Sequence, residues 1–320
     1  MDTLVFNLGD PCPQAGATAE TTVEATIETM VAAVVAATGA TRGELDTRRF
    51  PDGEAYLRVV TPCAGADVIL CAGLQPPDET TLRALLTAAT LRDLGAARIL
   101  LVAPYLPYMR QDSRFRAGEG ITSRYYAALL SAHFDGLITV DPHLHRYAAL
   151  SELYSIPAVC VHAAPAIGAW VREHVAEPVL IGPDSESRQW VEAVAAVAGA
   201  PFIVLEKVRR GDRDVSVSEP DLIDHDGRQP VVLDDIISSG RTMAEAVARV
   251  NGRGGPQPVC IAIHPVFADG AVADLRAAGA GRVVSCNTIA HHTNAIDVSP
   301  LIGEACRGFL GGTVRRAIGS

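Results

Sequence analysis

The sequence predicts an α/β fold built as two similar domains, each a mostly parallel sheet flanked by helices. Short apolar runs alternate with helical segments along the 320 residues, a pattern typical of parallel sheets with crossover helices. One strand–loop–helix–strand unit occurs twice. The length fits two domains of ordinary size, and a hydrophobic content of 48% supplies a core for each.

The repeated unit is evident when residues 68–106 are set beside residues 231–267. Both segments begin with an apolar strand, pass through a loop and a helix to a second strand, and then reach a proline. The copies lie about half a chain apart, so we infer that the domains arose by duplication. We place the first domain at 1–150 and the second at 151–302, and expect the tail 303–320 to join the first.

In the first domain, apolar periodicity predicts helices and sheet strands in alternation. The turn Pro51-Asp52-Gly53 predicts a hairpin, because proline presets the turn backbone and glycine accepts a left-handed one. Residues 105–120 are rich in arginine and lack an apolar period, so we expect a mobile loop able to meet a polyphosphate; the alternative is a solvated charged loop. The expected helices are 18–38, 79–94 and 121–133, and the expected strands are 4–8, 68–72, 98–103 and 137–140.

In the second domain, one basic residue stands out. The chain has 27 basic residues but a single lysine, Lys207, which follows an expected strand in a basic loop. Because the composition favours arginine, a retained lysine is a candidate for chemistry that needs a compact ammonium group. The expected helices are 165–175, 188–198, 243–250 and 299–307, and the expected strands are 179–182, 202–205, 231–233 and 283–289.

The bulk composition excludes several classes of function. The net charge is −10, which argues against nucleic acid as a partner. An acidic protein that binds anionic substrates usually needs a divalent cation. No run of about 18 apolar residues occurs, so we expect no membrane span. The seven cysteines are scattered without a C-x-x-C pair, which indicates a reduced, cytoplasmic compartment and no structural zinc.

The second copy of the repeat continues into a segment suited to a sugar phosphate. After the strand 231–233 come two acids and then small hydroxylated residues that lead into a helix. A helix N-terminus offers free N–H groups to a phosphate, and glycine permits close approach, whereas carboxylates accept hydrogen bonds from sugar hydroxyls. The alternative is an ordinary turn with a Ser or Thr cap. The residues are Asp234, Asp235, Ser238, Ser239, Gly240, Arg241 and Thr242.

Two further strand ends carry candidate ligands. Asp141, His143 and His145 follow the last strand of the first domain, and an acid with two histidines indicates a metal or phosphate site. Asp184 follows the strand 179–182. Because parallel strands bring their carboxyl ends to one edge of a sheet, these positions are where a ligand site is expected.

Several of these segments resemble known enzymes. L-D-D-I-I-S-S-G-R-T at 233–242 resembles the phosphoribosyl-pyrophosphate loop of type I phosphoribosyltransferases and of ribose-phosphate pyrophosphokinases (PRPP synthetases). The resemblance to the second family extends over nearly the whole chain, with motifs in the family's order. These motifs are F-P-D-G-E at 50–54, R-Q-D at 110–112, D-P-H at 141–143, P-D at 183–184 and the lysine at 207. The resemblance implies two phosphoribosyltransferase-like domains.

The resemblance also implies a reaction and residue roles. The reaction is transfer of the β,γ-diphosphoryl group of Mg-ATP to the C1 hydroxyl of ribose 5-phosphate, giving PRPP and AMP, with Mg²⁺ as cofactor. A homo-oligomer is implied, in which a neighbouring subunit completes the ATP site. The implied ATP contacts are Phe50, Asp52, Gly53, Glu54, Arg110, Gln111 and Asp112; the metal residues are His143 and Asp184; the catalytic residues are Lys207 and Arg209; and the ribose 5-phosphate contacts are Asp234, Asp235, Ser238, Ser239, Gly240, Arg241 and Thr242.

Two alternatives stay open on the sequence. A phosphoribosyltransferase that consumes PRPP accounts for the loop at 233–242 but not for the motifs of the first domain. A catalytically weak regulatory subunit would keep the fold and lose site residues. Retention of the lysine, its neighbouring arginine and the metal residues argues against it, whereas Ser185-Glu186-Ser187, where the family usually has glycines, keeps it open.

Overall fold

A computed structural model describes residues 2–9, 20–205, 207–210, 214–217, 227–252 and 255–312, with side chains described except at 20–25, 207–210 and 214–217. The chain divides into two compact units, the first holding residues 1–162, 288–290 and 299–320 and the second holding 163–287 and 291–298. The first unit continues past residue 150 because strand β8 (Ala158–Val161) completes its sheet. None of the helices in the described ranges is long and apolar enough to cross a membrane.

The first unit is built on a six-stranded parallel sheet with the order β2-β1-β5-β6-β7-β8. Strands β5 and β7 are buried along their whole length, which explains their continuous apolar runs. The bounds are β1 (Thr3–Leu8), β2 (Thr41–Gly43), β5 (Asp67–Ala72), β6 (Arg98–Val102) and β7 (Gly136–Val140).

The second unit has a six-stranded parallel sheet with the order β10-β9-β13-β14-β15-β16. Its strands occupy the sheet in the same sequence of positions as those of the first unit, so β13 and β14 correspond to β5 and β6. This confirms the predicted duplication. The bounds are β9 (Pro178–Gly182), β10 (Phe202–Val204), β13 (Gln229–Ile236), β14 (Val259–His264), β15 (Arg282–Cys286) and β16 (Asn294–Ile296).

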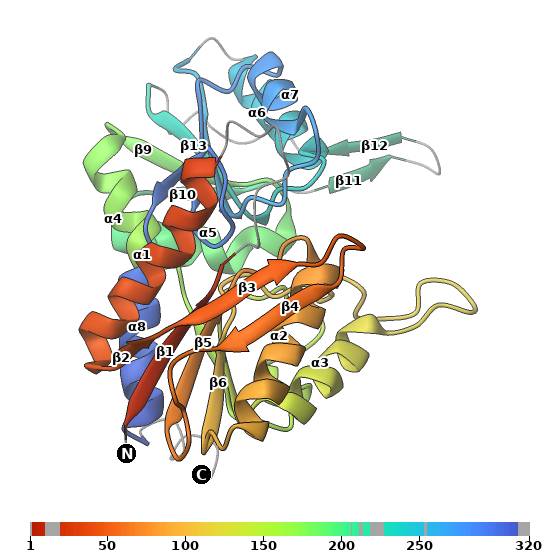
Figure 1. The fold of residues 1–320 in the computed structure, drawn as a ribbon. Coiled ribbons are helices and arrows are strands. Elements are labelled where there is room, and N and C mark those ends of the chain that lie inside the picture. The colour runs from red at the N-terminus through yellow and green to blue at the C-terminus, as the bar shows by residue number, and fades with distance from the viewer. Residues whose placement is uncertain are drawn as a thin grey trace. The chain divides into compact units, whose positions relative to one another are not determined.

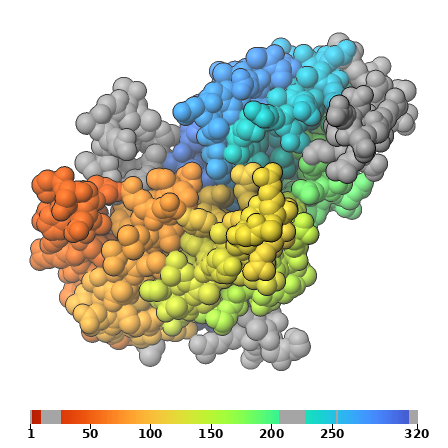
Figure 2. All heavy atoms as spheres, turned by 90° about the vertical axis from the view of Figure 1, so that its right-hand side faces the viewer, coloured from red at the N-terminus to blue at the C-terminus, as the bar shows by residue number. Residues whose placement is uncertain are grey.

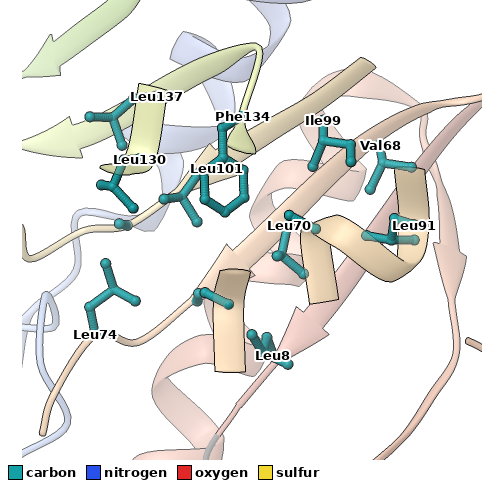
Figure 3. Packing of buried hydrophobic residues seen from close by; sticks show 14 of the residues in the cluster. Leu8, Val68, Leu70, Leu74, Leu91, Ile99, Leu101, Leu130, Phe134 and Leu137 are labelled. Atoms are coloured by element: carbon teal, nitrogen blue, oxygen red, sulfur yellow. The ribbon is translucent and has the colours of Figure 1, made fainter. Parts of the chain in front are cut away.

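Helices cover both faces of the first sheet (Figure 1). Helices α1 and α8 pack on each other and on the sheet, whereas α2 and α3 lie on the opposite face. The core on the α2 and α3 face includes Leu70, Leu101, Leu130 and Phe134, which point toward one another in Figure 3. The bounds are α1 (Glu20–Thr38), α2 (Pro77–Asp93), α3 (Thr122–His133) and α8 (Ser299–Leu310).

The second unit has the same layered plan. Helix α5 packs on β9, β10 and β13, and α6 and α7 pack on each other and on the sheet. Met243 and Val247 of α6 join Leu275 of α7 and Ile181 of β9 in the buried core. The bounds are α4 (Ala164–His174), α5 (Arg188–Ala198), α6 (Arg241–Asn251) and α7 (Ala271–Ala277), and short 3₁₀ turns lie at η1 (Leu150–Glu152) and η2 (Ser185–Ser187).

Most predicted elements are confirmed, and the differences have local causes. The hairpin predicted from Pro-Asp-Gly forms from β3 (Leu45–Arg49) and β4 (Ala55–Val59). The basic loop predicted around Lys207 is instead a strand, β11 (Lys207–Arg210), because it pairs antiparallel with β12 (Asp214–Val217). Strand β13 runs on to Ile236, since Asp234 and Ile236 still pair with β14, so the two acids lie inside the strand's end. The segment 10–17, whose prolines and glycine predict a loop, lies outside the described residues.

The C-terminal helix joins the first unit through a close helix–helix contact. A Cβ added at Gly303 of α8 would lie 2.7 Å from the carbonyl oxygen of Ala33 and 3.1 Å from the Cβ of Ala37, both in α1. Glycine at this position therefore lets the two helix backbones approach. The contact ties the end of the chain to the helix that follows its first strand.

We expect Gly303→Ala to destabilise the protein by about 1–3 kcal/mol, because the added methyl group must push α8 away from α1. Gly308→Ala is the matched control in the same helix. Its Cβ would meet nothing within 4 Å, so alanine should be neutral or stabilise by up to about 1 kcal/mol. Urea unfolding of the three proteins measures both effects, and equal stability of the two variants would contradict the close contact.

Candidate functional site

The acids of the second unit gather where β9 and β13 end. These strands are neighbours in the sheet, with Ile181 opposite Val232, so the residues that follow them emerge at the same edge. Asp234 and Asp235 lie at the end of β13, and Asp184 lies just beyond β9. The strand pairing therefore brings Asp184 close to Asp234 and Asp235, which follow it by about fifty positions in the sequence.

Asp234 is the acid most affected by this crowding. Burial first, and then the charges of Asp235, Asp184 and Glu186, raise the pKa of the Asp234 carboxyl well above its usual value of 3.8. The backbone N–H of Asp235 opposes this by donating to Asp234 Oδ1 at 3.0 Å. We call Asp184, Asp234 and Asp235 the acid corner. A divalent cation or the hydroxyl groups of a sugar bind favourably at such a group of acids, because either one offsets the repulsion between the carboxylates.

A turn then carries β13 into helix α6, as predicted. Gly240 has a φ of 72°, a left-handed conformation that a side chain would strain. No side chain among the described residues caps α6 at this position, so the N–H groups of its first turn are available to an anion. Ser239 and Arg241 are exposed, and Ser238 and Thr242 are half-buried. The turn thus offers backbone and hydroxyl donors beside the acids.

Asp184 is held by the 3₁₀ turn η2. Its carboxylate accepts a hydrogen bond from the backbone N–H of Glu186 at 3.1 Å, and Ser187 Oγ donates to the carbonyl of Asp184 at 2.6 Å. Ser187 is fully buried, and a Cβ at Gly182 would lie 2.3 Å from its hydroxyl. The serines that replace expected glycines therefore build an ordered turn, and Glu186 adds charge beside Asp234.

Sequence reasoning missed two buried polar residues near this edge. His264 ends β14 opposite Ile236 and is 1% exposed. Asn287 follows β15, where its amide donates to Asp297 Oδ1 at 2.6 Å and its oxygen accepts from the N–H of Val298 at 2.9 Å. Each polar residue closes an apolar strand, as in V-C-I-A-I-H, and that change of character is the signal that could have found them.

In the first unit, the segment 50–54 forms the tip of the β3–β4 hairpin. The N–H of Phe50 donates to the carbonyl of Glu54 at 2.8 Å, and Gly53 N–H donates to the carbonyl of Phe50 at 2.9 Å. Glu54 N–H is bound by the carboxylate of Asp52 at 3.2 Å. The Arg48 guanidinium lies 4.9 Å from the ring centre of Phe50, which holds the exposed ring in place.

A groove of about 470 Å³ runs between this hairpin and helix α2. Its walls mix charge with apolar surface, since Arg49 forms an ion pair with Glu79 at one side and Leu82 and Leu86 lie at the other. Both leucines are exposed, at 59% and 47%. A nucleotide base or a neighbouring protein surface would cover such a groove favourably.

The arginine-rich segment 105–120 extends from the first unit as a loop and forms a raised yellow ridge in Figure 2. Internal hydrogen bonds order its tip: the carboxylate of Glu119 accepts from the N–H groups of Phe115 and Arg116 at 2.7 and 2.9 Å. Arg110 is exposed and Gln111 is half-buried. Asp112 differs, because it is buried and its carboxylate accepts from Arg146 Nε at 3.2 Å.

The remaining candidates lie after β7 and in β11. His143 is half-buried after β7, and its ring centre lies 3.7 Å from that of exposed His145. Lys207 and Arg209 are two residues apart in β11. Their side chains lie outside the described part of the structure, and their roles stay predictions.

Comparison with known proteins agrees with this architecture. A family model for the N-terminal domain of ribose phosphate pyrophosphokinase matches residues 22–133, and a phosphoribosyl transferase domain model matches residues 149–301. The crystal structure of phosphoribosylpyrophosphate synthetase from Mycobacterium smegmatis has a TM-score of 0.79 and 22% identity, and the match covers 98% of this chain and 100% of that one. The structural likeness establishes the fold.

Curated relatives cover most of both chains. The ribose-phosphate pyrophosphokinase of Methanopyrus kandleri is 33% identical over 269 residues, which are 83% of this chain and 91% of the relative. The Methanothermobacter thermautotrophicus enzyme is 33% identical over 267 residues, with coverage of 82% and 91%. That of Halobacterium salinarum is 32% identical over 269 residues, with coverage of 83% and 93%.

The duplicated parallel sheets, with an acid corner and an uncapped helix turn at one carboxyl edge, define an enzyme with two phosphoribosyltransferase-like domains. Those domains are shared by more than one kind of enzyme, and the match at 22–133 distinguishes between them. The chain belongs to the ribose-phosphate pyrophosphokinase family.

We expect Asp234→Asn to stabilise the metal-free protein at pH 7, because burial and the neighbouring carboxylates disfavour the charged form of Asp234. The raised pKa sets the sign. Below about pH 4 the carboxyl is protonated in both states; as the pH rises, the unfolded state ionises first, and stability is lost. Thermal unfolding in chelator at pH 4 and pH 7 measures the change.

The matched control is Asp269→Asn, an exposed acid in the same unit, which should change stability little. The stability gained by Asp234→Asn should be larger at pH 7 than at pH 4. A loss of stability on replacing Asp234, at both pH values, would show that its carboxylate is favourably bound in the folded protein and would contradict the repulsion.

Proposed function

We propose that this enzyme transfers the β,γ-diphosphoryl group of ATP to the C1 hydroxyl of ribose 5-phosphate. The C1 oxygen forms a bond to the β-phosphorus, the bond from that phosphorus to the oxygen shared with the α-phosphorus breaks, and the hydroxyl proton leaves to solvent. The products are PRPP and AMP. The observation that carries this proposal is the acid corner beside the uncapped turn of α6, in a chain of this family.

The second unit binds the sugar phosphate. The N–H groups of the first turn of α6, with the hydroxyls of Ser238, Ser239 and Thr242 and the guanidinium of Arg241, hold the 5-phosphate. The carboxylates of Asp234 and its neighbour Asp235 accept hydrogen bonds from the ribose hydroxyls. Binding a hydroxyl donor at this corner also relieves repulsion that already exists in the folded protein, so the site is selective for a polyol carrying a phosphate.

The first unit binds ATP. The hairpin tip, with Phe50, Asp52, Gly53 and Glu54, presents an exposed ring to an adenine base and backbone and carboxylate groups to its ribose. Arg110 and Gln111 contact the polyphosphate. Asp112, which is bound by Arg146, orients this segment instead of repelling the phosphates. The loop 105–120 excludes water when it closes over the bound nucleotide.

The metal would be Mg²⁺. The acid corner fits a divalent cation, because carboxylate oxygens are the donors that such an ion prefers and burial with like charges raises the pKa of Asp234. Asp184 in the second unit and His143 in the first are the residues that would hold it. When bound, the ion neutralises polyphosphate oxygens and favours attack at the β-phosphorus.

Lys207 and Arg209 act on the group in transfer. Their positive charges stabilise the negative charge that develops on the diphosphoryl oxygens. A compact ammonium follows the moving phosphate more readily than a planar guanidinium does, which is consistent with a single retained lysine.

The assembly would be a homo-oligomer in which a neighbouring subunit completes the ATP site. Phe50 at the hairpin tip is 40% exposed, and the exposed Leu82 and Leu86 of α2 add apolar surface that lines the groove. Exposed apolar surface of this kind is typical of a protein interface. The proposed compartment is the cytoplasm, where both substrates are available and thiols stay reduced.

The proposed activity is tested by measuring AMP from ATP with and without ribose 5-phosphate, in Mg²⁺. We expect AMP to form only when the sugar phosphate is present. A phosphoribosyltransferase would instead need PRPP and a base, and a regulatory subunit would show no turnover. AMP formation that does not depend on ribose 5-phosphate would contradict the assignment.

We expect Lys207→Ala to lower turnover by about 100-fold or more, the effect of removing a group that stabilises transition-state charge. Lys207→Arg keeps the charge and should recover part of the loss. Steady-state AMP formation measures both, and circular dichroism checks the fold. Turnover unchanged in the alanine variant would exclude the catalytic role.

A mixing experiment tests the shared site. Lys207→Ala and Phe50→Ala are each expected to be impaired, but if Phe50 acts in the neighbour's site, mixed oligomers contain some sites with both native residues. Activity should then reappear after subunit exchange. Mixing Lys207→Ala with Arg209→Ala, two changes on the same strand, is the control and should restore nothing. Equal outcomes for the two mixtures would argue against a shared site.

A further inference from the structure

A second group of metal-ligating side chains lies at the outer edge of the first sheet, where β8 is the last strand. Cys160 in β8 and His162 directly after it are two residues apart, so they leave the strand on the same side. Asp141 follows the neighbouring strand β7, and its N–H donates to the carbonyl of Val161 at 3.0 Å. The strand pairing thus fixes all three residues.

The donor atoms of these residues are close together. His162 Nδ1 lies 2.9 Å from Asp141 Oδ1 and 3.9 Å from Cys160 Sγ, and one donor atom from each residue lies within 4.8 Å of the others. Asp141 is 4% exposed, whereas the His162 side chain is 73% exposed. The cluster is therefore buried at the carboxylate and open to solvent at the imidazole.

We propose that Asp141, Cys160 and His162 form a binding site for a thiophilic divalent cation of the Zn²⁺ or Cd²⁺ class. The thiolate and imidazole select against Mg²⁺, which prefers oxygen donors. The site is separate in chemistry from the oxygen-rich acid corner of the second unit. Binding requires the thiolate and the neutral imidazole, because metal ligands must be deprotonated.

The spacing of the three atoms suits a tetrahedral ion. Zn²⁺ at about 2.0 Å from nitrogen and oxygen and about 2.3 Å from sulfur needs its ligand atoms to lie about 3.3–3.6 Å apart. The observed separations of 2.9 and 3.9 Å fall on either side of that range. Small side-chain rotations therefore complete the site, and three protein ligands leave a fourth position open to water.

The strained backbone at Asp141 supports a dedicated arrangement. Its φ of 29° is one that an aspartate adopts at a cost, and the bond from His162 fixes the carboxylate in that conformation. The sequence did not reveal this site because Asp141 is remote from the other two ligands, and C-x-H is not a zinc spacing. An open site of this kind also differs from the closed structural zinc that the cysteine pattern excludes.

The experiment titrates the full-length protein with Cd²⁺ in excess Mg²⁺, which occupies the oxygen-rich sites. We expect a thiolate-to-cadmium charge-transfer band that saturates near one equivalent, and loss of that band in Cys160→Ser. His162→Gln changes an exposed side chain, so the fold should be kept, and it should weaken Cd²⁺ binding at least 10-fold. Calorimetry with Zn²⁺ should give the same ranking.

Two controls separate this site from other thiols. Cys63→Ser should keep the band, since the buried Cys63 sulfur donates to the carbonyl of Leu91 and a serine preserves that bond. His133→Gln, at a half-buried histidine in α3 away from the cluster, should keep the affinity. No band in the native protein, or an unchanged band and affinity in both Cys160→Ser and His162→Gln, would overturn the proposal.

Discussion

Repulsion between carboxylates at one edge of the second sheet is the constraint on which the site depends. Pairing of β9 with β13 fixes the edge at which both strands end, so Asp184 and Asp234 emerge close enough for their charges to interact. The apolar core beneath, with residues such as Ile181, Val232 and Val247, holds the strands in register against this repulsion. A corner strained in this way is stabilised by whatever ligand neutralises or hydrogen-bonds it, which links stability to binding.

The duplication explains why only one unit carries this chemistry. Both sheets place a strand–loop–helix unit at equivalent positions, yet helix α2 begins with Pro77 after Pro76, and prolines lack the N–H groups that a phosphate needs. Asp78 and Glu79 follow in its first turn and would repel an anion. At the equivalent turn of α6, Gly240 and hydroxylated residues leave the N–H groups accessible. The two copies therefore diverged at the helix start, not in the sheet.

The sequence predicted the sheets because their strands are buried on both faces and read as apolar runs, as β5 and β14 do. The sequence-based prediction failed where the local structure depends on a pairing partner elsewhere in the chain. Lys207 lies in a strand because residues 214–217 pair with it, and no local pattern of charged residues shows that. The partner of Asp112 was equally hidden, since Arg146 is remote in sequence. The motifs located the candidate site, but contacts between residues distant in the sequence determine which residues of each motif can face a ligand.

The chain separates two kinds of metal donor. Carboxylate oxygens gather at the carboxyl edge of the second sheet, whereas sulfur and nitrogen join a single carboxylate at the edge strand of the first. Mg²⁺ prefers oxygen ligands, whereas Zn²⁺ accepts oxygen, nitrogen and sulfur. The carboxylates of the second sheet therefore discriminate weakly between Mg²⁺ and Zn²⁺, and the cluster at the edge of the first sheet discriminates strongly. Where Mg²⁺ is abundant, it occupies the oxygen-rich sites by mass action. Cys160 and His162 would then bind only thiophilic ions. The chemistry of the donor atoms then determines which ion each site binds.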